Sequence, residues 1–245
     1  LFDLDNTLLG NDMDSFMPGY FDLLGRYAAP VMARGPFLQA LLACTQLTLA
    51  SVDTAVSNQD TFWQAFEQHT GQRRAELEPF FETFYRTQFP QLAALTQRRP
   101  TAAALVQHCF DLGLQVVIAT NPLFPRVAIE ARLAWAGVPV SAFAYDLVTT
   151  YENMHSTKPH PAYYEEILQH LGCRPAEALM VGDDWRNDIV PAAAVGLHTY
   201  WLPEPDAPPP DAGLVAACGS LDMLLHGIQN GWLAALAPRA AHEAA

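Results

Sequence analysis

From residue 98 onward, the chain alternates between short apolar runs and stretches with helical spacing. Short apolar runs bounded by turn residues are typical of buried strands, whereas helical segments are longer and often end at glycine. The expected strands lie at 114–119, 143–150, 178–181, 198–202 and 214–218. The expected helices lie at 101–112, 125–135, 161–171, 187–195 and 221–228, although Pro191 disfavours a helix in the fourth stretch. Strands that alternate with helices predict a mostly parallel sheet covered on both faces.

The stretch 14–97 has a different pattern, in which aromatic residues and leucines recur three and four positions apart. Phe16 and Tyr20 show this spacing, and so do Phe62, Trp63 and Phe66. Such spacing places side chains on one face of a helix and is more typical of a packed core than of a ligand-binding surface. No run in this stretch has the pattern of a buried strand, so we expect it to be all-helical.

The two patterns predict an α/β protein with a Rossmann-like, doubly wound and mostly parallel sheet, into which an all-helical domain is inserted. The core is expected to comprise 1–13 and 98–235, the insert 14–97, and an alanine-rich, frayed tail 236–245. Only two residues precede Asp3, although a strand usually has about five or six. We therefore expect further apolar residues before Leu1.

Composition narrows the possible functions. The formal net charge is −13 at pH 7, which argues against a nucleic-acid partner because a phosphate-backbone binder needs a basic surface. The four cysteines are widely scattered without a C-x-x-C pair, as expected of thiols in a reducing compartment. No apolar run reaches the roughly 18 residues of a membrane helix, and no signal peptide is visible. These features predict a soluble, cytoplasmic protein with no membrane partner.

Two aspartates close the first apolar run, at Asp3 and Asp5. In an extended strand, residues two apart point the same way, so both carboxylates would be aimed at one place. Two like charges held that close are unfavourable unless a cation neutralises them or one of the carboxylates is protonated, and Mg²⁺ is a cation that prefers carboxylate oxygens. The alternative is an exposed turn in which these residues serve only turn chemistry.

Polar residues also follow two later strands, at the carboxyl ends where this architecture places its ligands. Thr120 and Asn121 follow the strand at 114–119 and precede a helix, so they either bind an anion or cap that helix. Asp183, Asp184 and Asp188 follow the strand at 178–181. Capping explains one aspartate of these three, and a metal ion or a lysine would relieve the repulsion among them.

Lys158 is the one lysine among the 13 basic residues, and arginine supplies the others. A general preference for arginine leaves this position unexplained, unless it is a chance survivor. Lysine offers a compact charge on a flexible stem, which the planar guanidinium group does not. Lys158 precedes the helix at 161–171, near the same edge of the sheet, where the acidic residues should hold it protonated.

These clusters, in this order, resemble the motifs of the haloacid dehalogenase (HAD) superfamily. Residues 3–7 match its D-x-D-x-T/V motif, and Thr120 matches the Ser or Thr that ends an apolar strand. Lys158 matches the family lysine, and Asp183 and Asp188 match the acidic run G-D-x-x-x-x-D. The match spans about 1–10 and 98–203, and the helical insert stands where the family carries its cap domain. The resemblance therefore implies a phosphatase-type hydrolase with a helical cap.

The resemblance also implies roles for the acidic residues. Asp3 would be the nucleophile that forms an aspartyl phosphate. Asp5 would protonate the leaving oxygen and then activate water. Mg²⁺ would be held by Asp3, by the backbone carbonyl of Asp5 and by Asp183. Asp188 would orient Lys158 or a metal-bound water.

The phosphoryl oxygens would be held by Thr120, Asn121 and Lys158, since their charge in the transition state needs positioned donors. Asp184 is not fixed by the motif, and its role stays open. The physiological substrate and the oligomeric state also stay open, although a small phosphorylated metabolite is expected as the partner.

Several functions share this framework. A Mg²⁺-dependent phosphatase acting on a small phosphorylated metabolite is the first hypothesis. A sugar-phosphate mutase has the same motifs and a similar cap, so it is the alternative. A 2-haloacid dehalogenase is disfavoured because a halide leaving group needs no acid such as Asp5. A non-catalytic binding protein is disfavoured because all four motifs are intact.

Overall fold

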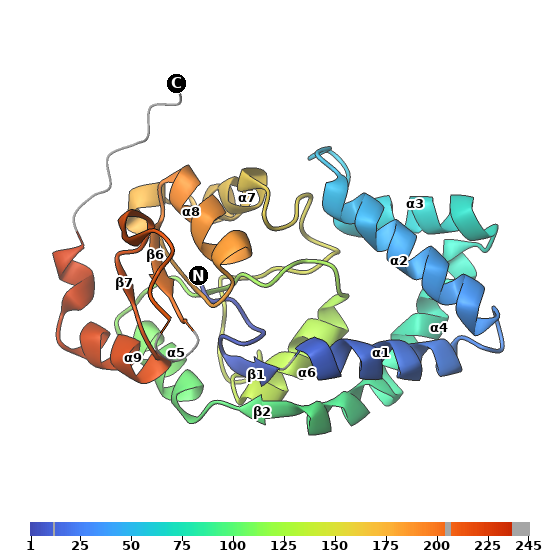
Figure 1. The fold of residues 1–245 in the computed structure, drawn as a ribbon, viewed down its shortest axis with the longest axis horizontal. Helices are drawn as coiled ribbons and strands as arrows, with labels where there is room; N and C mark the ends of the chain where they lie inside the picture. The colour runs from blue at the N-terminus through green and yellow to red at the C-terminus, as the bar shows by residue number, and fades with distance from the viewer. Residues whose placement is uncertain (12, 204–206, 237–245) are drawn as a thin grey trace.

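A parallel sheet forms the centre of the fold in the computed structural model, which describes residues 1–11, 13–203 and 207–236 (Figure 1). The strands of this sheet are β3 (Val117–Ile118), β4 (Leu147–Val148), β5 (Leu179–Gly182), β6 (His198–Trp201) and β7 (Ala217–Cys218). The register pairs β3 with β4, β5 with β6, and β6 with β7, all in parallel.

The N-terminal segment joins these two groups of strands. Phe2 pairs in parallel with both Ile118 of β3 and Val181 of β5. The Phe2 amide donates to the Val117 carbonyl at 2.8 Å, and the Asp3 amide donates to the Val181 carbonyl at 2.9 Å. Residues 1–3 therefore run along the middle of the sheet, and the chain leaves its carboxyl edge at Asp3.

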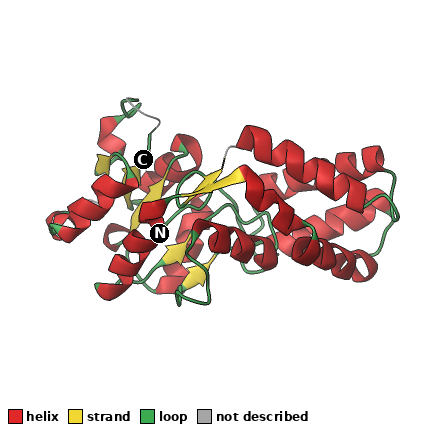
Figure 2. Ribbon diagram, turned by 90° about the horizontal axis from the view of Figure 1, so that it is seen from below, coloured by secondary structure: helices red, strands yellow, loops and turns green. Residues whose placement is uncertain are grey.

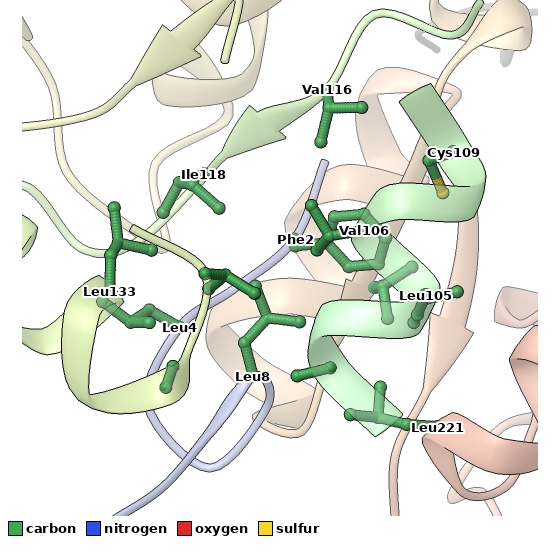
Figure 3. Close-up of a cluster of buried hydrophobic side chains, with 14 of the residues drawn as sticks. Phe2, Leu4, Leu8, Leu105, Val106, Cys109, Val116, Ile118, Leu133 and Leu221 are labelled. Atoms are coloured by element: carbon green, nitrogen blue, oxygen red, sulfur yellow. The ribbon is translucent and has the colours of Figure 1, made fainter. Parts of the chain in front are cut away.

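Helices cover both faces of the sheet, as the alternation of side chains along its strands requires. One face packs against α5 (Pro100–Asp111), α6 (Arg126–Ala136) and α9 (Leu221–Gln229). The other face packs against α7 (Pro161–Leu171) and α8 (Val190–Val195). Figure 3 shows Phe2 and Ile118 on the first face, in contact with a cluster that includes residues of α5 and α6.

The segment between β1 (Leu9–Asn11) and β2 (Thr96–Arg98) is helical and lies to one side of the core (Figures 1 and 2). It consists of α1 (Met13–Tyr27), α2 (Arg34–Ala50), α3 (Asn58–Thr70), α4 (Arg74–Thr87) and the 3₁₀ helix η1 (Phe89–Leu95). These helices have an apolar core of their own, in which Phe16, Phe37 and Phe84 are fully buried. The buried residues of this apolar core all belong to the helical segment, except Ala128, which belongs to α6. We call this helical segment the cap.

The two connections between core and cap are joined to each other. Leu9 faces Arg98 and Asn11 faces Thr96 in an antiparallel pair formed by β1 and β2. The sequence did not predict this pairing, because three-residue strands with mostly polar or exposed side chains carry no periodic signal. The connections form one two-stranded ribbon instead of two separate linkers.

The expected α/β fold, with a mostly parallel sheet and an inserted helical cap, is confirmed. One helix differs from the expectation at 187–195. A π-helical turn, η3 (Trp185–Ile189), comes first, and α8 begins at Val190. Pro191 therefore lies in the first turn of α8, where proline is tolerated. The domain limits at residues 13/14 and 97/98 remain a prediction, and the expected frayed tail lies almost wholly outside the described residues.

Substituting a buried core residue tests this packing. Leu133 is fully buried in α6 and lies beside Leu4 in Figure 3. We expect Leu133→Ala to lower the free energy of unfolding by ~2–5 kcal/mol, because it leaves a cavity in a close-packed core. Chemical denaturation measures this change. Leu112→Ala is the control, since Leu112 is 50% exposed, and an equal loss in both variants would contradict the assignment of Leu133 to the core.

Candidate active site

The chain turns sharply as soon as it leaves the sheet at Asp3. The Leu4 carbonyl accepts hydrogen bonds from the amides of Thr7, Leu8 and Leu9, at 3.3, 3.0 and 2.9 Å. Asn6 adopts φ of +57°, a left-handed conformation that asparagine tolerates better than most residues. This turn fixes Asp3 at the strand end and carries Asp5 away from the strand axis.

Lys158 is the centre of a buried cluster of charges. Its Nζ donates to Asp3 Oδ1 at 2.8 Å and to Asp188 Oδ1 at 2.6 Å. Lys158 is 2% exposed, Asp3 8% and Asp188 1%. Asp3 ends the N-terminal segment 1–3, Lys158 lies in the segment after β4, and Asp188 lies in η3. The carboxyl edge of the sheet therefore brings the three residues together, as the sequence predicts.

Burial and mutual charge set the protonation of this cluster. Burial raises the pKa of Asp3, and the Lys158 ammonium group opposes that rise. Burial also raises the pKa of Asp188 to about 8, again against the effect of Lys158. Burial alone would lower the pKa of Lys158, but the two carboxylates more than offset it and hold the pKa well above its usual value. Lys158 is therefore protonated at neutral pH.

Asp183 completes an acidic cluster beside this lysine. The Thr7 hydroxyl donates to Asp183 Oδ1 at 3.2 Å. Carboxylate oxygens of Asp3, Asp183 and Asp188 all lie within 4.8 Å of one another. Burial, followed by the Asp3 charge, raises the pKa of Asp183 to about 7. The raised pKa values indicate that Lys158 alone does not supply enough positive charge to keep these buried carboxylates ionised.

The cluster fits a magnesium ion. Mg²⁺ binds oxygen ligands at about 2.1 Å in octahedral geometry, so neighbouring ligands lie about 3 Å apart and opposite ligands about 4 Å apart. The 4.8 Å spread of the aspartate oxygens is close to these distances. Asp3 and Asp183 are the ligands expected from the sequence, and Asp188 lies near enough to be a third. Because Asp188 also accepts from Lys158, its expected role as an orienting group is compatible with the geometry.

Asp5 lies in a different environment from Asp3. Its Oδ1 accepts from Asn11 Nδ2 at 2.9 Å, and its Oδ2 pairs with Arg132. The expectation that strand alternation aims Asp3 and Asp5 at one place is therefore wrong in its reason, since the chain turns between them. Both oxygens of Asp5 are held by donors.

Thr120 and Asn121 lie beside Asp3, because they follow β3, which pairs with the N-terminal segment 1–3. Thr120 is buried, and its carbonyl accepts from the hydroxyls of Thr149 and Tyr163 at 2.7 and 2.9 Å. These contacts use the backbone and leave the Thr120 hydroxyl available to a ligand. Asn121 Oδ1 accepts from the Lys158 amide at 3.3 Å and joins the segment after β3 to the segment that contains Lys158.

Asp184 proves to be a capping residue. One of its carboxylate oxygens accepts from the amides of Arg186 and Asn187, at 2.8 and 3.0 Å. Asp184 is therefore the residue at which η3 begins. Gly182 has a steric role beside it, since a Cβ there would lie 2.2 Å from Asp188 Oδ2. Any larger residue at 182 would displace Asp188.

Sequence reasoning missed several residues that contact the site. Arg132 is 2% exposed, and its Nε and one terminal nitrogen have no partner among the described residues. Arg132 lies three residues after the buried Ile129 and four before Ala136. This spacing places its charge on the apolar face of a helix, and that was the sequence signal for a functional role. Tyr163 gave no comparable signal, because aromatic residues at helical spacing are usual in cores.

Comparison with known proteins decides the family. The profile of the haloacid dehalogenase-like hydrolases matches residues 1–196. The chain belongs to this family. A pyrophosphatase PpaX from Bacillus cereus (strain AH820) is 28% identical over 199 residues, which cover 81% of this chain and 80% of that protein. This HAD-like protein is therefore a member of a hydrolase family, as its motifs imply.

Solved structures show the same fold. A HAD phosphatase from Thermococcus onnurineus has a TM-score of 0.55 and 21% identity, and the match covers 94% of this chain and 96% of that one. A HAD family hydrolase from Deinococcus radiodurans R1 has a TM-score of 0.53 and 19% identity, covering 97% and 96%. Among the described residues of this HAD-like protein, no helix has the length and apolar character needed to cross a bilayer.

The raised pKa of Asp183 predicts how stability depends on pH. Between its usual value of 3.8 and about 7, the folded state keeps a proton that the unfolded state releases, so stability falls as pH rises. We expect the melting temperature of metal-free protein to fall by several degrees from pH 4 to pH 7. Asp183→Asn should reduce this fall and Asp184→Asn should not. Equal pH profiles in both variants would contradict the assignment.

Proposed function

We propose that this HAD-like protein is a Mg²⁺-dependent phosphatase that hydrolyses a small phosphorylated metabolite through an aspartyl-phosphate intermediate. The observation that carries this proposal is the buried contact of Lys158 with both Asp3 and Asp188, with the Asp183 carboxylate nearby. A protonated lysine beside a cluster of aspartates suits a phosphoryl group that binds together with a metal ion. The relative named as a pyrophosphatase supports phosphate chemistry.

Asp3 is proposed as the nucleophile. One of its oxygens forms a bond to phosphorus while the bond between phosphorus and the leaving oxygen breaks. Lys158 and the Thr120 hydroxyl bind the phosphoryl oxygens and stabilise the charge that develops on them. Asn121 positions Lys158 through the backbone contact between them. A bound Mg²⁺ would supply further positive charge at the phosphoryl group, held by Asp3, Asp183 and the Asp5 carbonyl.

Asp5 is proposed as the acid and base. It gives a proton to the leaving oxygen in the first step and takes a proton from water in the second. That water attacks phosphorus, the bond to Asp3 breaks, and inorganic phosphate leaves. Because Arg132 and Asn11 hold both oxygens of Asp5 in this structure, at least one contact must be released before Asp5 can carry the proton.

Related activities differ in what accepts the phosphoryl group. In a sugar-phosphate mutase the acceptor is a substrate hydroxyl, whereas a phosphatase uses water. An assay that follows both released phosphate and isomerised sugar phosphate separates the two. The expected cytoplasmic location is likewise part of this proposal, because a small phosphorylated metabolite is available there.

Replacing the nucleophile tests the chemistry. We expect Asp3→Asn to lower phosphate release from a panel of phosphorylated metabolites by at least ~10³-fold, since an amide cannot form the intermediate. The change is nearly isosteric, so circular dichroism should show an unchanged fold. Asp184→Asn is the control, because Asp184 only caps a turn. Near-normal turnover in Asp3→Asn would remove Asp3 from this role.

The metal requirement has its own test. We expect phosphate release to need Mg²⁺ and to stop after exhaustive chelation. Asp183→Asn should raise the half-saturating Mg²⁺ concentration at least ~10-fold, because it removes a charged ligand. Asp184→Asn should leave that concentration unchanged. Full activity of chelated enzyme would show that the carboxylate cluster serves another purpose.

A further inference from the structure

A large cavity lies between the cap and the core. Its volume is about 610 Å³, within the range of ~300–1,000 Å³ that is usual for small-molecule sites. Its walls come from α1 to α4 and from the core segments 123–127 and 151–152. The proposed catalytic residues are absent from its lining.

The walls of this cavity are mainly aromatic. Tyr20, Phe37, Trp63 and Phe81 line it from four different cap helices, and Phe124 lines it from the core. Aromatic walls bury apolar groups over a large area and favour stacking with another ring. Four separate helices contribute aromatic side chains to the cavity wall. We therefore expect the group that occupies the cavity to be apolar.

Charged residues on the lining are already paired, and they are mostly acidic. Arg126 pairs with Glu130 at 3.3 Å, and Arg86 pairs with Glu82 at 2.7 Å. Glu78 pairs with Arg74 at 2.9 Å. Counting Glu152 as well, the lining contains four glutamates against two arginines. A second anionic group on a ligand would be repelled here.

Short connections link the cavity to the proposed catalytic site. Phe124 lies four positions after Thr120, a span of at most ~14 Å. The Arg132 guanidinium lies 4.7 Å from the centre of the Phe124 ring and also pairs with Asp5. The leaving group of the substrate, which would take up the proton from Asp5, would therefore extend toward this cavity.

One polar group on the wall has room for a partner. Trp63 is 4% exposed, and its indole nitrogen makes no hydrogen bond of good geometry, although Tyr151 lies close to it. Burial raises the pKa of Tyr151 to about 12, so its hydroxyl stays neutral. These two side chains can serve a neutral acceptor on a ligand.

We propose that this cavity binds the leaving group of the substrate, and that this group is apolar and uncharged, with an aromatic ring or alkyl chain. The inference rests on the proposed phosphatase function, which it makes more specific. It separates this HAD-like protein from an enzyme that prefers pyrophosphate or a sugar bisphosphate, whose leaving groups are anionic.

A series of 4-alkylphenyl phosphates tests the proposal. Lengthening the alkyl chain from methyl to butyl adds apolar area and hardly changes the acidity of the phenol. We expect kcat/KM to rise about fourfold for each methylene that enters the cavity. The butyl ester should also exceed pyrophosphate and a sugar bisphosphate in kcat/KM. No dependence on chain length, or a preference for either anionic substrate, would overturn the proposal.

Two variants on one helix locate the effect. Leu41 of α2 lines the cavity and is half-buried, whereas Leu47 of the same helix is 58% exposed and outside the lining. We expect Leu41→Gln to reduce the gain per methylene to twofold or less, and Leu47→Gln to keep the wild-type gain. The same dependence on chain length in both variants would place the alkyl group elsewhere and contradict the proposal.

Equilibrium binding separates this inference from the proposed function. Calorimetry of wild-type protein with 4-butylphenol should show saturable binding that Leu41→Gln weakens and Leu47→Gln preserves. Absence of such binding would overturn the assignment of the cavity. If binding is found but no phosphate ester is hydrolysed with Mg²⁺, the phosphatase proposal fails while the apolar site remains.

Discussion

The site depends on one ammonium group buried among carboxylates. Lys158 contacts Asp3 and Asp188 directly, and Asp183 lies in the same cluster. Removing charged groups from water is costly, and opposite charges repay that cost only when their geometry is good. The sheet provides this geometry, because its parallel strands end at one edge and deliver their side chains together. The missing Cβ of Gly182 then lets Asp188 pack against the strand end. The order of the strands thus determines which charged side chains meet, and therefore the electrostatics of the site.

A second charge contact, between Asp5 and Arg132, lies where the core meets the cap. Arg132 belongs to α6, a helix that packs against the sheet through Leu133 and against the cap through Ala128. The β1–β2 ribbon joins both crossings of the chain, so a movement of the cap would be transmitted to the turn that holds Asp5. Closure of a cap over an active site excludes water and completes the catalytic arrangement. Such a movement of the cap could release the contacts that hold the Asp5 carboxylate.

Much of the fold could be predicted because its signals are local. Apolar runs marked the buried strands, and glycines at 137 and 172 end helices in left-handed conformations, as helix stop signals predict. Asp3, Lys158 and Asp188 could be placed together since the ends of parallel strands converge. The ribbon and the contact between Asp5 and Arg132 could not be predicted, because they depend on tertiary packing between segments more than 80 residues apart in sequence. A turn of a few residues after Asp3 was enough to give Asp5 hydrogen-bond partners that strand alternation does not predict.

Charge distribution connects the catalytic cluster with the cavity. The protein has a formal charge of −13, and its few cations are mostly bound to neighbouring carboxylates. In the proposed function, the phosphoryl group of the ligand binds at the strand ends, where Lys158 and a bound Mg²⁺ would supply positive charge. The proposed leaving group would then lie against the aromatic walls of the cap, where four glutamates disfavour another anion. One anionic site beside one apolar site therefore selects for a ligand with a charged end and an uncharged body. The aromatic pattern of residues 14–97, which the sequence explained as helix packing, serves both purposes, because the same rings that build the cap core also line its cavity.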